Sequence, residues 1–341
     1  MDFRLSDDQR ALRAGIRELL AARFPRERHR AAVDAEEPEN HFDHALWREL
    51  GKAGLFGLRL PEEAGGVGLG PAEAVLVFEE AGRAHLPGPL VATHLAAGLV
   101  PGAAEGTTVV TALERPGMVE HLAAADAVLL LDGPAPRVLE TSGGRGPVLL
   151  AARSVRSVDP TTPLHLVERL PPPQETKPTP GPRRSADLSQ AAMLLTAAQQ
   201  LGSAGRTLEM AVSYAKSRTQ FGRPIGAFQA VQHLCAQMLV RTELARSSAY
   251  AASLIMTLRD ISVAKLLADE AAVRNARDCL QLHGGMGFTW EGDIHPHLKR
   301  AWLRVEQWQT GAEAEEVLAA ALLGRPENCS TEIANHPNGA V

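Results

Sequence analysis

The sequence is poor in cysteine and in aromatic residues. Only three cysteines occur in 341 residues, and Cys235, Cys279 and Cys329 have no metal-like spacing. They predict neither a disulfide framework nor a zinc site, and they fit a reducing cytoplasm. Aromatic residues make up 4% of the chain, so the core must be built from Leu, Ala and Val. Segments rich in Ala and Leu favour helix.

The sequence also lacks apolar segments for a membrane and a strong positive charge, and these two absences exclude classes of function. No apolar run approaches the ~20 residues of a membrane-spanning helix, and the first ten residues, MDFRLSDDQR, are too acidic and polar for a signal peptide. We therefore expect a cytoplasmic protein without a membrane partner. The formal net charge is −5, so the chain has no strong basic field with which to recruit a nucleic acid.

Helical periodicity marks both ends of the chain. Ser6 and Gln9 form a capping-box pattern ahead of apolar residues at helical spacing, which predicts a helix up to about residue 24. We predict a mainly α fold, with an N-terminal helical domain (1–100), a C-terminal bundle of the four-helix type (185–324) and a polar tail (325–341). Further helices are expected at about 47–53, 71–82, 90–99, 186–217, 227–258, 261–283, 293–306 and 312–323.

The pattern between residues 101 and 184 differs. Short apolar runs separated by Gly, Pro and Asp predict strands of a small β domain. The proline-rich stretch 171–182 is expected to lack regular structure and to be either a linker or a wrapped extended segment. The predicted strands are 107–114, 127–132, 147–152 and 164–170.

The connection between two long predicted helices, SRTQFGRPIGAFQAVQ (217–232), contains residues suited to a nucleotide. Arg218 offers a bidentate cation for a phosphate or pyrophosphate. Phe221 offers a stacking face, and Gln220 and Gln229 offer amides for polar ligand edges. Taken alone, the segment is more typical of a helix–helix connection with an ordinary surface arginine.

A second glycine-containing segment, QLHGGMGFTWEGD (281–293), follows about 60 residues later. Gly284 and Gly285 lack Cβ atoms, so a ligand can approach the backbone and its amides can hold an anion. Taken alone, this segment is typical of a helix closed by glycine, and His283 is expected to be a packed or capping histidine.

Together the two segments resemble the C-terminal bundle signature of the acyl-CoA dehydrogenase family. The stretch WRELGKAGLFGLRLPEEAGGVGLG (47–70) resembles that family's N-terminal helical domain. The resemblance implies FAD as cofactor, an acyl-CoA substrate and electron-transfer flavoprotein as acceptor. In the family, these motif residues bind the adenosine-diphosphate half of a flavin held by the neighbouring subunit, which implies an oligomer. The corresponding candidates here are Arg218, Gln220, Phe221, Gln229, Gln281, Gly284 and Gly285.

The sequence departs from the family in the middle domain and at the catalytic base. Residues 101–184 contain no tryptophan and nothing similar to the family's flavin-holding segment, so the β domain is expected to be reduced. Aligning the family's Tyr-Glu-Gly-Thr segment puts Gln309 in the place of the catalytic glutamate. An amide cannot accept the α-proton, and a general base is commonly worth ~10²–10⁴ in rate. The alternative first-helix position, around 191–192, is alanine, which leaves Glu306 and Glu313 as reserve candidates.

These features suggest the partner of a catalytic subunit in a heteromeric, α2β2-type acyl-CoA dehydrogenase. Steroid side-chain degradation is the best-known setting for such heterotetramers. Two alternatives stay open: a self-sufficient dehydrogenase with a relocated base, for which the oligomer would be a homo-oligomer, and a flavin-free scaffold subunit.

Overall fold

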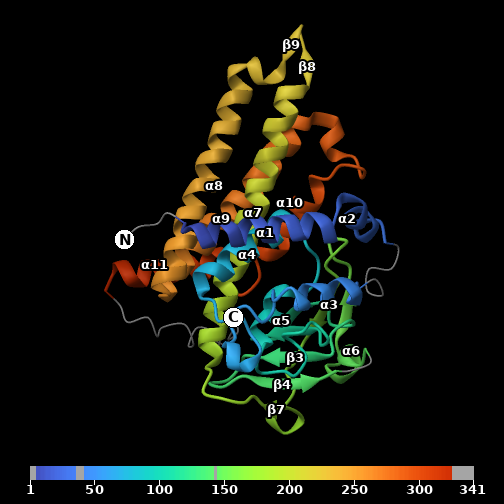
Figure 1. Ribbon diagram of the computed structural model, residues 1–341, viewed down its shortest axis with the longest axis vertical. Coiled ribbons are helices and arrows are strands. Elements are labelled where there is room, and N and C mark those ends of the chain that lie inside the picture. Colours follow the sequence, from blue (N-terminus) through green and yellow to red (C-terminus); the bar gives the residue numbers. More distant parts are fainter. Residues whose placement is uncertain (1–4, 36–41, 142–143, 325–341) are drawn as a thin grey trace, which may run out of the picture.

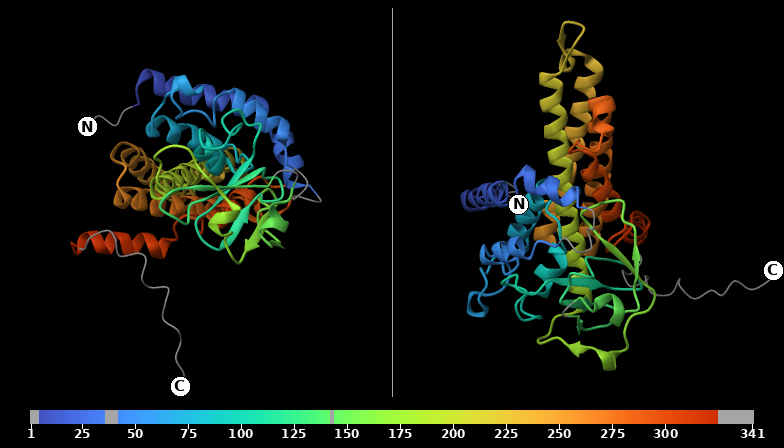
Figure 2. Two further views of the ribbon diagram at one scale, coloured as in Figure 1. Left: turned by 90° about the horizontal axis from the view of Figure 1, so that it is seen from below. Right: turned by 90° about the vertical axis from the view of Figure 1, so that its right-hand side faces the viewer.

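Helices of the N-terminal region pack along one side of the lower half of a long helical bundle (Figures 1 and 2). The structure is a computed structural model and describes residues 5–35, 42–141 and 144–324. The expected capping box is present, because the Gln9 amide N–H donates to Ser6 Oγ and the Ser6 N–H donates to Gln9 Oε1, each at 3.1 Å. The elements are α1 (Asp7–Arg23), α2 (Arg26–Val33), α3 (His44–Lys52), the 3-10 turn η2 (Glu62–Ala64), α4 (Pro71–Arg83) and α5 (Leu90–Ala96).

The middle region forms two small sheets below the bundle, as the side view in Figure 2 also shows. One sheet has the order β1-β3-β4-β7 and the other β2-β6-β5; only β1 and β3 pair in parallel. A separate apolar cluster that includes Leu122, Val128 and Val167 packs in this region. The strands are β1 (Val110–Leu113), β2 (Gly117–Glu120), β3 (Ala127–Leu130), β4 (Arg137–Glu140), β5 (Arg153–Val155), β6 (Leu164–Val167) and β7 (Lys177–Pro178).

Two expectations for the middle region were wrong. The apolar run 147–152 is not a strand, because a short helix, α6 (Gly146–Leu149), begins at Gly146-Pro147 and leaves Val148 81% exposed. Proline is favoured in the first turn of a helix, and an exposed apolar run lacks the burial that the strand prediction assumed. The stretch 171–182 contains the 3-10 turn η3 (Pro173–Glu175) and strand β7, which extends the first sheet.

Three long antiparallel helices form the bundle, and their upper end projects beyond the rest of the molecule (Figures 1 and 2). A two-stranded hairpin closes the first turn of the bundle at its tip. In the part of the chain that the structure describes, no helix is long and apolar enough to span a bilayer. The elements are α7 (Ser185–Ser217), β8 (Thr219–Gln220), β9 (Arg223–Pro224), η4 (Ile225–Ala227), α8 (Gln229–Ile255), α9 (Leu258–His283), η5 (Gly284–Phe288), α10 (His295–Arg304) and α11 (Gly311–Leu322).

Glycine allows α4 and α7 to approach each other closely. A Cβ atom at Gly202 would lie 1.8 Å from the Glu79 carbonyl oxygen, and one at Gly82 would lie 2.0 Å from the Gln199 carbonyl oxygen. This crossing joins the N-terminal helices to the bundle in one continuous apolar core.

Candidate functional site

The first motif occupies the hairpin at the tip of the bundle. Arg218 caps the C-terminus of α7, and its exposed guanidinium makes no hydrogen bond or ion pair with any residue described. Phe221 is 91% exposed and adopts a φ of 53°. A bulky side chain rarely adopts a left-handed backbone, and this residue buries nothing in return within the chain. The hairpin therefore presents a cation and an aromatic ring outward.

The two glutamines of this motif are also exposed. Gln220 donates its amide to the carbonyl of the adjacent Thr219 at 2.8 Å. Gln229 is the first residue of α8, so its side chain lies beside the N-terminus of a 27-residue helix. Both amides are accessible to a ligand lying along the tip.

A ring stack brings the second motif to the same end of the bundle. His283, at the end of α9, stacks on Tyr214 of α7 with ring centroids 3.9 Å apart and an interplanar angle of 22°. The His283 Nδ1–H donates to the Cys279 carbonyl at 2.8 Å, so His283 packs and caps as expected. Tyr214 lies one turn before Arg218, so the stack couples the two motifs.

The glycines beyond this stack leave the backbone open. Gly284 adopts φ 58° and ψ −139°, and no heavy atom lies within 4 Å of a Cβ position at Gly284 or Gly285. Gln281 precedes them on the exposed side of α9. A ligand can therefore reach the backbone amides here without displacing a side chain.

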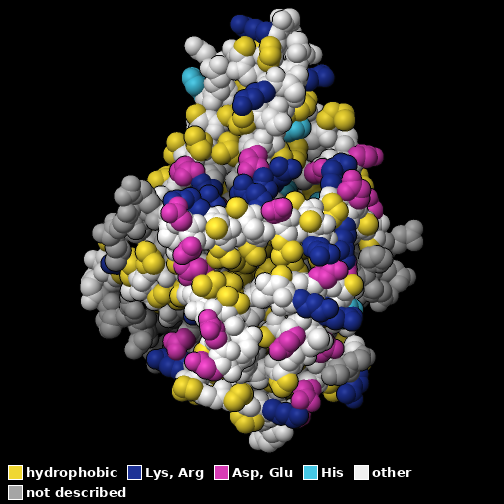
Figure 3. All heavy atoms as spheres, in the orientation of Figure 1, with side chains coloured by type: hydrophobic (Ala, Val, Ile, Leu, Met, Phe, Trp, Pro, Cys, Tyr) yellow, Lys and Arg dark blue, Asp and Glu magenta, His cyan; other side chains and the backbone are white. Residues whose placement is uncertain are grey.

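Hydrophobic side chains also gather on the surface of the upper bundle (Figure 3). Helix α8 exposes Leu239, Val240 and Leu244 by about half of their surface each, and η5 exposes Met286 by 67% and Phe288 by 73%. Exposed apolar surface of this kind is typical of a protein–protein interface.

Gln309, which the resemblance aligns with the family's catalytic glutamate, points into the protein. Its side chain is 6% exposed, and its Nε2 donates to Ser262 Oγ of α9 at 3.0 Å. Its Oε1 is buried without a hydrogen-bond partner among the residues described. The preceding Trp308 has a φ of 66°, so the chain turns sharply there.

A cavity of about 440 Å³ lies beside this turn, between the β domain and the end of α10. Glu306, Gln307 and Trp308 line it, whereas Gln309 does not. Sequence reasoning missed two further carboxylates in its wall, Glu114 and Glu120. Burial raises the pKa of both, although a hydrogen bond from Ser189 opposes this at Glu114 and the Arg304 charge opposes it at Glu120.

The two reserve glutamates differ in environment. Glu313 caps α11 through Thr310 and pairs with Arg115 at 2.6 Å. A hydrogen bond from Arg115 lowers the pKa of Glu313 to about 2, so this group is a weak base. Glu306 is exposed and lines the 440 Å³ cavity, and its carboxylate has no hydrogen-bond partner in the described part of the chain.

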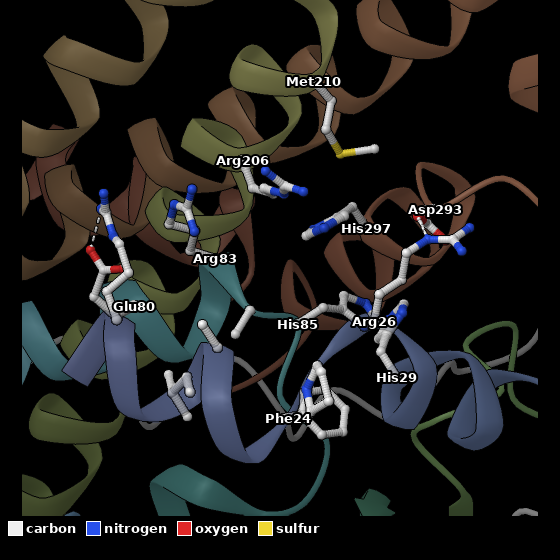
Figure 4. Close-up of a pocket in the computed structure, with 15 residues that line it drawn as sticks. Phe24, Arg26, His29, Glu80, Arg83, His85, Arg206, Met210, Asp293 and His297 are labelled. Atoms are coloured by element: carbon white, nitrogen blue, oxygen red, sulfur yellow. Dashed lines mark hydrogen bonds and ion pairs between the residues drawn. The ribbon is translucent and has the colours of Figure 1, made fainter. Parts of the chain in front are cut away.

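A second cavity, of about 340 Å³, lies between α1 and the helices α4, α7 and α10 (Figure 4). Its arginines have acidic partners: Arg26 pairs with Asp293 at 2.6 Å and Arg17 with Glu80 at 2.6 Å. Burial lowers the pKa of the nearby His29 to about 4, so this imidazole is neutral. The cavity therefore offers compensated charges, and we assign it no part in the reaction.

Comparison with known proteins identifies the fold. The N-terminal domain of acyl-CoA dehydrogenase matches residues 6–112, and its C-terminal domain matches residues 190–322. Acyl-CoA dehydrogenase IpdE2 of Mycobacterium tuberculosis is 35% identical over 292 residues, which cover 84% of this chain and 89% of that protein. This chain belongs to the acyl-CoA dehydrogenase family.

Solved structures of acyl-CoA dehydrogenases have the same architecture. The Tcur3481-Tcur3483 steroid ACAD variant has a TM-score of 0.78 and 26% identity, covering 93% of this chain and 98% of that one. The ChsE4-ChsE5 complex from Mycobacterium tuberculosis has a TM-score of 0.78 at 23% identity, covering 96% of this chain and all of that one. The expected family and mainly α fold are confirmed, and so is FAD as the cofactor of the family.

The residues at the bundle tip fit one half of FAD. Among the residues described, Arg218 has an unpaired guanidinium for a pyrophosphate, Phe221 has a ring that meets only the edge of Phe228 and is 91% exposed, and Gly284 and Gly285 have an open backbone. All of them are exposed at this end of the bundle.

Proposed function

We propose that this chain is the non-catalytic partner subunit of a heteromeric, FAD-dependent acyl-CoA dehydrogenase. The observation behind the proposal is the orientation of Gln309, the residue that the resemblance aligns with the family's catalytic glutamate: its amide turns toward Ser262 and does not line the neighbouring cavity. The exposed and unpaired residues at the bundle tip support a role toward a second chain.

In this proposal the chain completes the adenine end of a flavin held mainly by the catalytic subunit. Arg218 pairs with the pyrophosphate, Phe221 packs against the nucleotide, and Gln281 with Gly284 and Gly285 lies along it. The bound flavin would supply the acceptor for the hydride that leaves the β-carbon of the acyl thioester. The catalytic subunit supplies the carboxylate that removes the α-proton, and electron-transfer flavoprotein takes up the electrons.

A steroid-derived acyl-CoA is the substrate class that we propose. The support is the similarity to a protein named as a steroid ACAD, at 26% identity over 93% of this chain. The two-component names of that protein and of the ChsE4-ChsE5 complex support a heterotetramer with a catalytic subunit. A cytoplasmic location remains the expectation from the sequence.

Co-expression with a candidate catalytic subunit tests the proposal. We expect a heterotetramer in light scattering, a flavin absorption spectrum for the complex, and acyl-CoA oxidation by the complex only. The purified chain alone should not oxidise acyl-CoA. A strict monomer under both conditions would contradict the proposal.

The 440 Å³ cavity favours one alternative, a self-sufficient dehydrogenase whose base is Glu306. That enzyme would oxidise acyl-CoA alone and would lose activity in Glu306→Gln. A flavin-free scaffold, the third reading, would assemble with its partner normally but leave the FAD content of the complex unchanged in Arg218→Gln.

A further inference from the structure

A third cavity, of about 200 Å³, lies at the C-terminal end of α5. The segment after α3, the C-terminal half of α5 and the first turns of α7 enclose it. Its walls are largely apolar and include Phe56, Leu60, Leu188 and Ala191. Phe56 is fully buried, and Leu60 and Leu188 are 6% exposed, so the floor of the cavity is rigid.

Four polar residues interrupt this lining: Arg59, Arg183, His94 and Asp187. Arg59 extends along the cavity from an exposed position and makes no hydrogen bond or ion pair with any described residue. Arg183 directs its Nη1 toward the carbonyl oxygens of Ala97 (3.2 Å) and Leu95 (3.4 Å) at the end of α5. Carbonyl groups orient this guanidinium but do not neutralise it.

The charges around the cavity are therefore unbalanced. Partial burial of its guanidinium against the cavity wall, together with the neighbouring Arg183, lowers the pKa of Arg59, and no described acidic residue offsets these two effects. His94 is 4% exposed, and burial with the Arg59 charge lowers its pKa to about 4, so its ring is neutral. Asp187 is the one acidic residue in the lining, and it sits in the first turn of α7, where the helix dipole already stabilises it.

We propose that this cavity binds a small organic carboxylate, with the carboxylate between Arg59 and Arg183 and an apolar body against Phe56, Leu60 and Leu188. Guanidinium groups bind carboxylates with two parallel hydrogen bonds, and an anion here would relieve the repulsion between the two arginines. The cavity is smaller than the ~300–1,000 Å³ pockets of drug-sized ligands, so a compact acid fits it. Because this binding needs neither FAD nor a second subunit, it goes beyond the proposed function and can be tested separately.

Calorimetric titration of the purified full chain with hexanoate tests the proposal. Hexanamide is the matched control ligand, because it keeps the shape of hexanoate and loses the charge. We expect hexanoate to bind with a Kd of about 1 mM or tighter, and hexanamide at least about tenfold more weakly. Inorganic phosphate, which has the charge without the apolar body, should not displace hexanoate.

Two substitutions assign the binding to this cavity. Arg59→Gln should weaken hexanoate binding about tenfold without changing the thermal unfolding midpoint, because Arg59 has no partner within the described chain. Asp187→Asn should strengthen binding, because it removes the competing carboxylate. No heat of binding up to about 10 mM hexanoate, equal binding of hexanamide, displacement by phosphate, or unchanged binding in Arg59→Gln would each overturn the proposal.

Discussion

The Arg115 guanidinium at the end of β1 lies 2.6 Å from the Glu313 carboxylate at the start of α11. The pair joins the β domain to the last helix, although 198 residues separate its members. Because Arg115 and the Thr310 cap together engage Glu313, that carboxylate is a structural group and is not free to accept a substrate proton.

We therefore predict that neither reserve glutamate is the catalytic base. In the complex with the catalytic subunit, Glu313→Gln and Glu306→Gln should each leave kcat within a few-fold of the unmodified value. Loss of a true general base would cost ~10²–10⁴ in rate, so steady-state kinetics can tell these outcomes apart. A rate loss of that size in Glu306→Gln would instead support the self-sufficient enzyme.

Arg218→Gln should reduce the FAD content of the complex. Its guanidinium is free within the described residues, and a hydrogen bond to a charged group is worth about 1.5–3 kcal/mol, which is roughly a 10–150-fold change in affinity. The measurement is FAD binding followed by flavin fluorescence.

Arg223→Gln is the matched control in the same hairpin. The Arg223 guanidinium lies over the Phe228 ring, 4.3 Å from its centroid, and is therefore occupied within the chain. If both variants bind FAD equally well, the assignment of Arg218 to the pyrophosphate is wrong.

Gly202→Ala should destabilise the fold at the crossing of α4 and α7. The added methyl group would lie 1.8 Å from the Glu79 carbonyl oxygen, and two buried helices would have to separate. Overpacking of this kind typically costs 1–3 kcal/mol, so we expect a loss of about that size or more in urea unfolding.

Gly205→Ala, on the same helix, is the control. Its Cβ position has only Arg246 Nη2 nearby, at 3.7 Å. Alanine is favoured over glycine in a helix by roughly 1 kcal/mol, so this variant should be as stable as the parent protein or more stable. A similar loss of stability in both variants would argue against the close approach.

Asp159 should make stability depend on pH in the acid range. It is fully buried and accepts hydrogen bonds from Arg300 Nε and Thr162 Oγ1, each at 2.7 Å. Burial alone would raise the pKa of Asp159, but the Arg300 charge and these hydrogen bonds lower it below its ordinary value. The stability that the ionised group contributes is therefore fully present above the unfolded pKa of about 3.9, and is lost as pH falls through the lower folded pKa.

Asp159→Asn leaves Arg300 buried without its counter-charge and should cost ~3–5 kcal/mol of unfolding free energy at pH 7. The difference from the parent protein should shrink below about pH 4, which urea unfolding at pH 7 and pH 3 can measure. For comparison, Glu140→Gln breaks the exposed pair with Lys177 and should lower the unfolding free energy by at most about 1 kcal/mol. A pH-independent difference for Asp159→Asn would contradict this account.

The sequence predicted the long helices well and the short elements poorly. Helix α7 (Ser185–Ser217) lies within one residue of its expected bounds, since helical periodicity repeats over many turns. Strands β2 and β4 and helix α2 were missed, because four to eight residues carry little periodic signal. At α6, the sequence contains the expected apolar run, but the structure does not bury it.

In the candidate site, too, local features could be predicted and long-range contacts could not. Local motifs identified Arg218 and Gln281 as candidates, and the Tyr214–His283 stack then places their segments at one end of the bundle. Contacts between residues far apart in the chain could not be predicted from the sequence. No pattern in it relates Arg115 to Glu313, or Arg59 to Arg183. Such contacts depend on how distant segments pack, which one-dimensional patterns do not encode.

Gln309→Glu restores the family's residue type and should still not make the chain active alone. The Gln309 side chain is buried against Ser262, so a carboxylate there would face α9 and not the cavity lined by Glu306 and Trp308. Burial would raise the pKa of the introduced acid above its unfolded value of about 4.3. The variant should therefore be close to parental stability at acid pH and lose stability as pH rises above that value, because ionisation then favours the unfolded chain. Acyl-CoA oxidation by the isolated variant, together with stability that does not change with pH, would mean that position 309 faces the substrate after all.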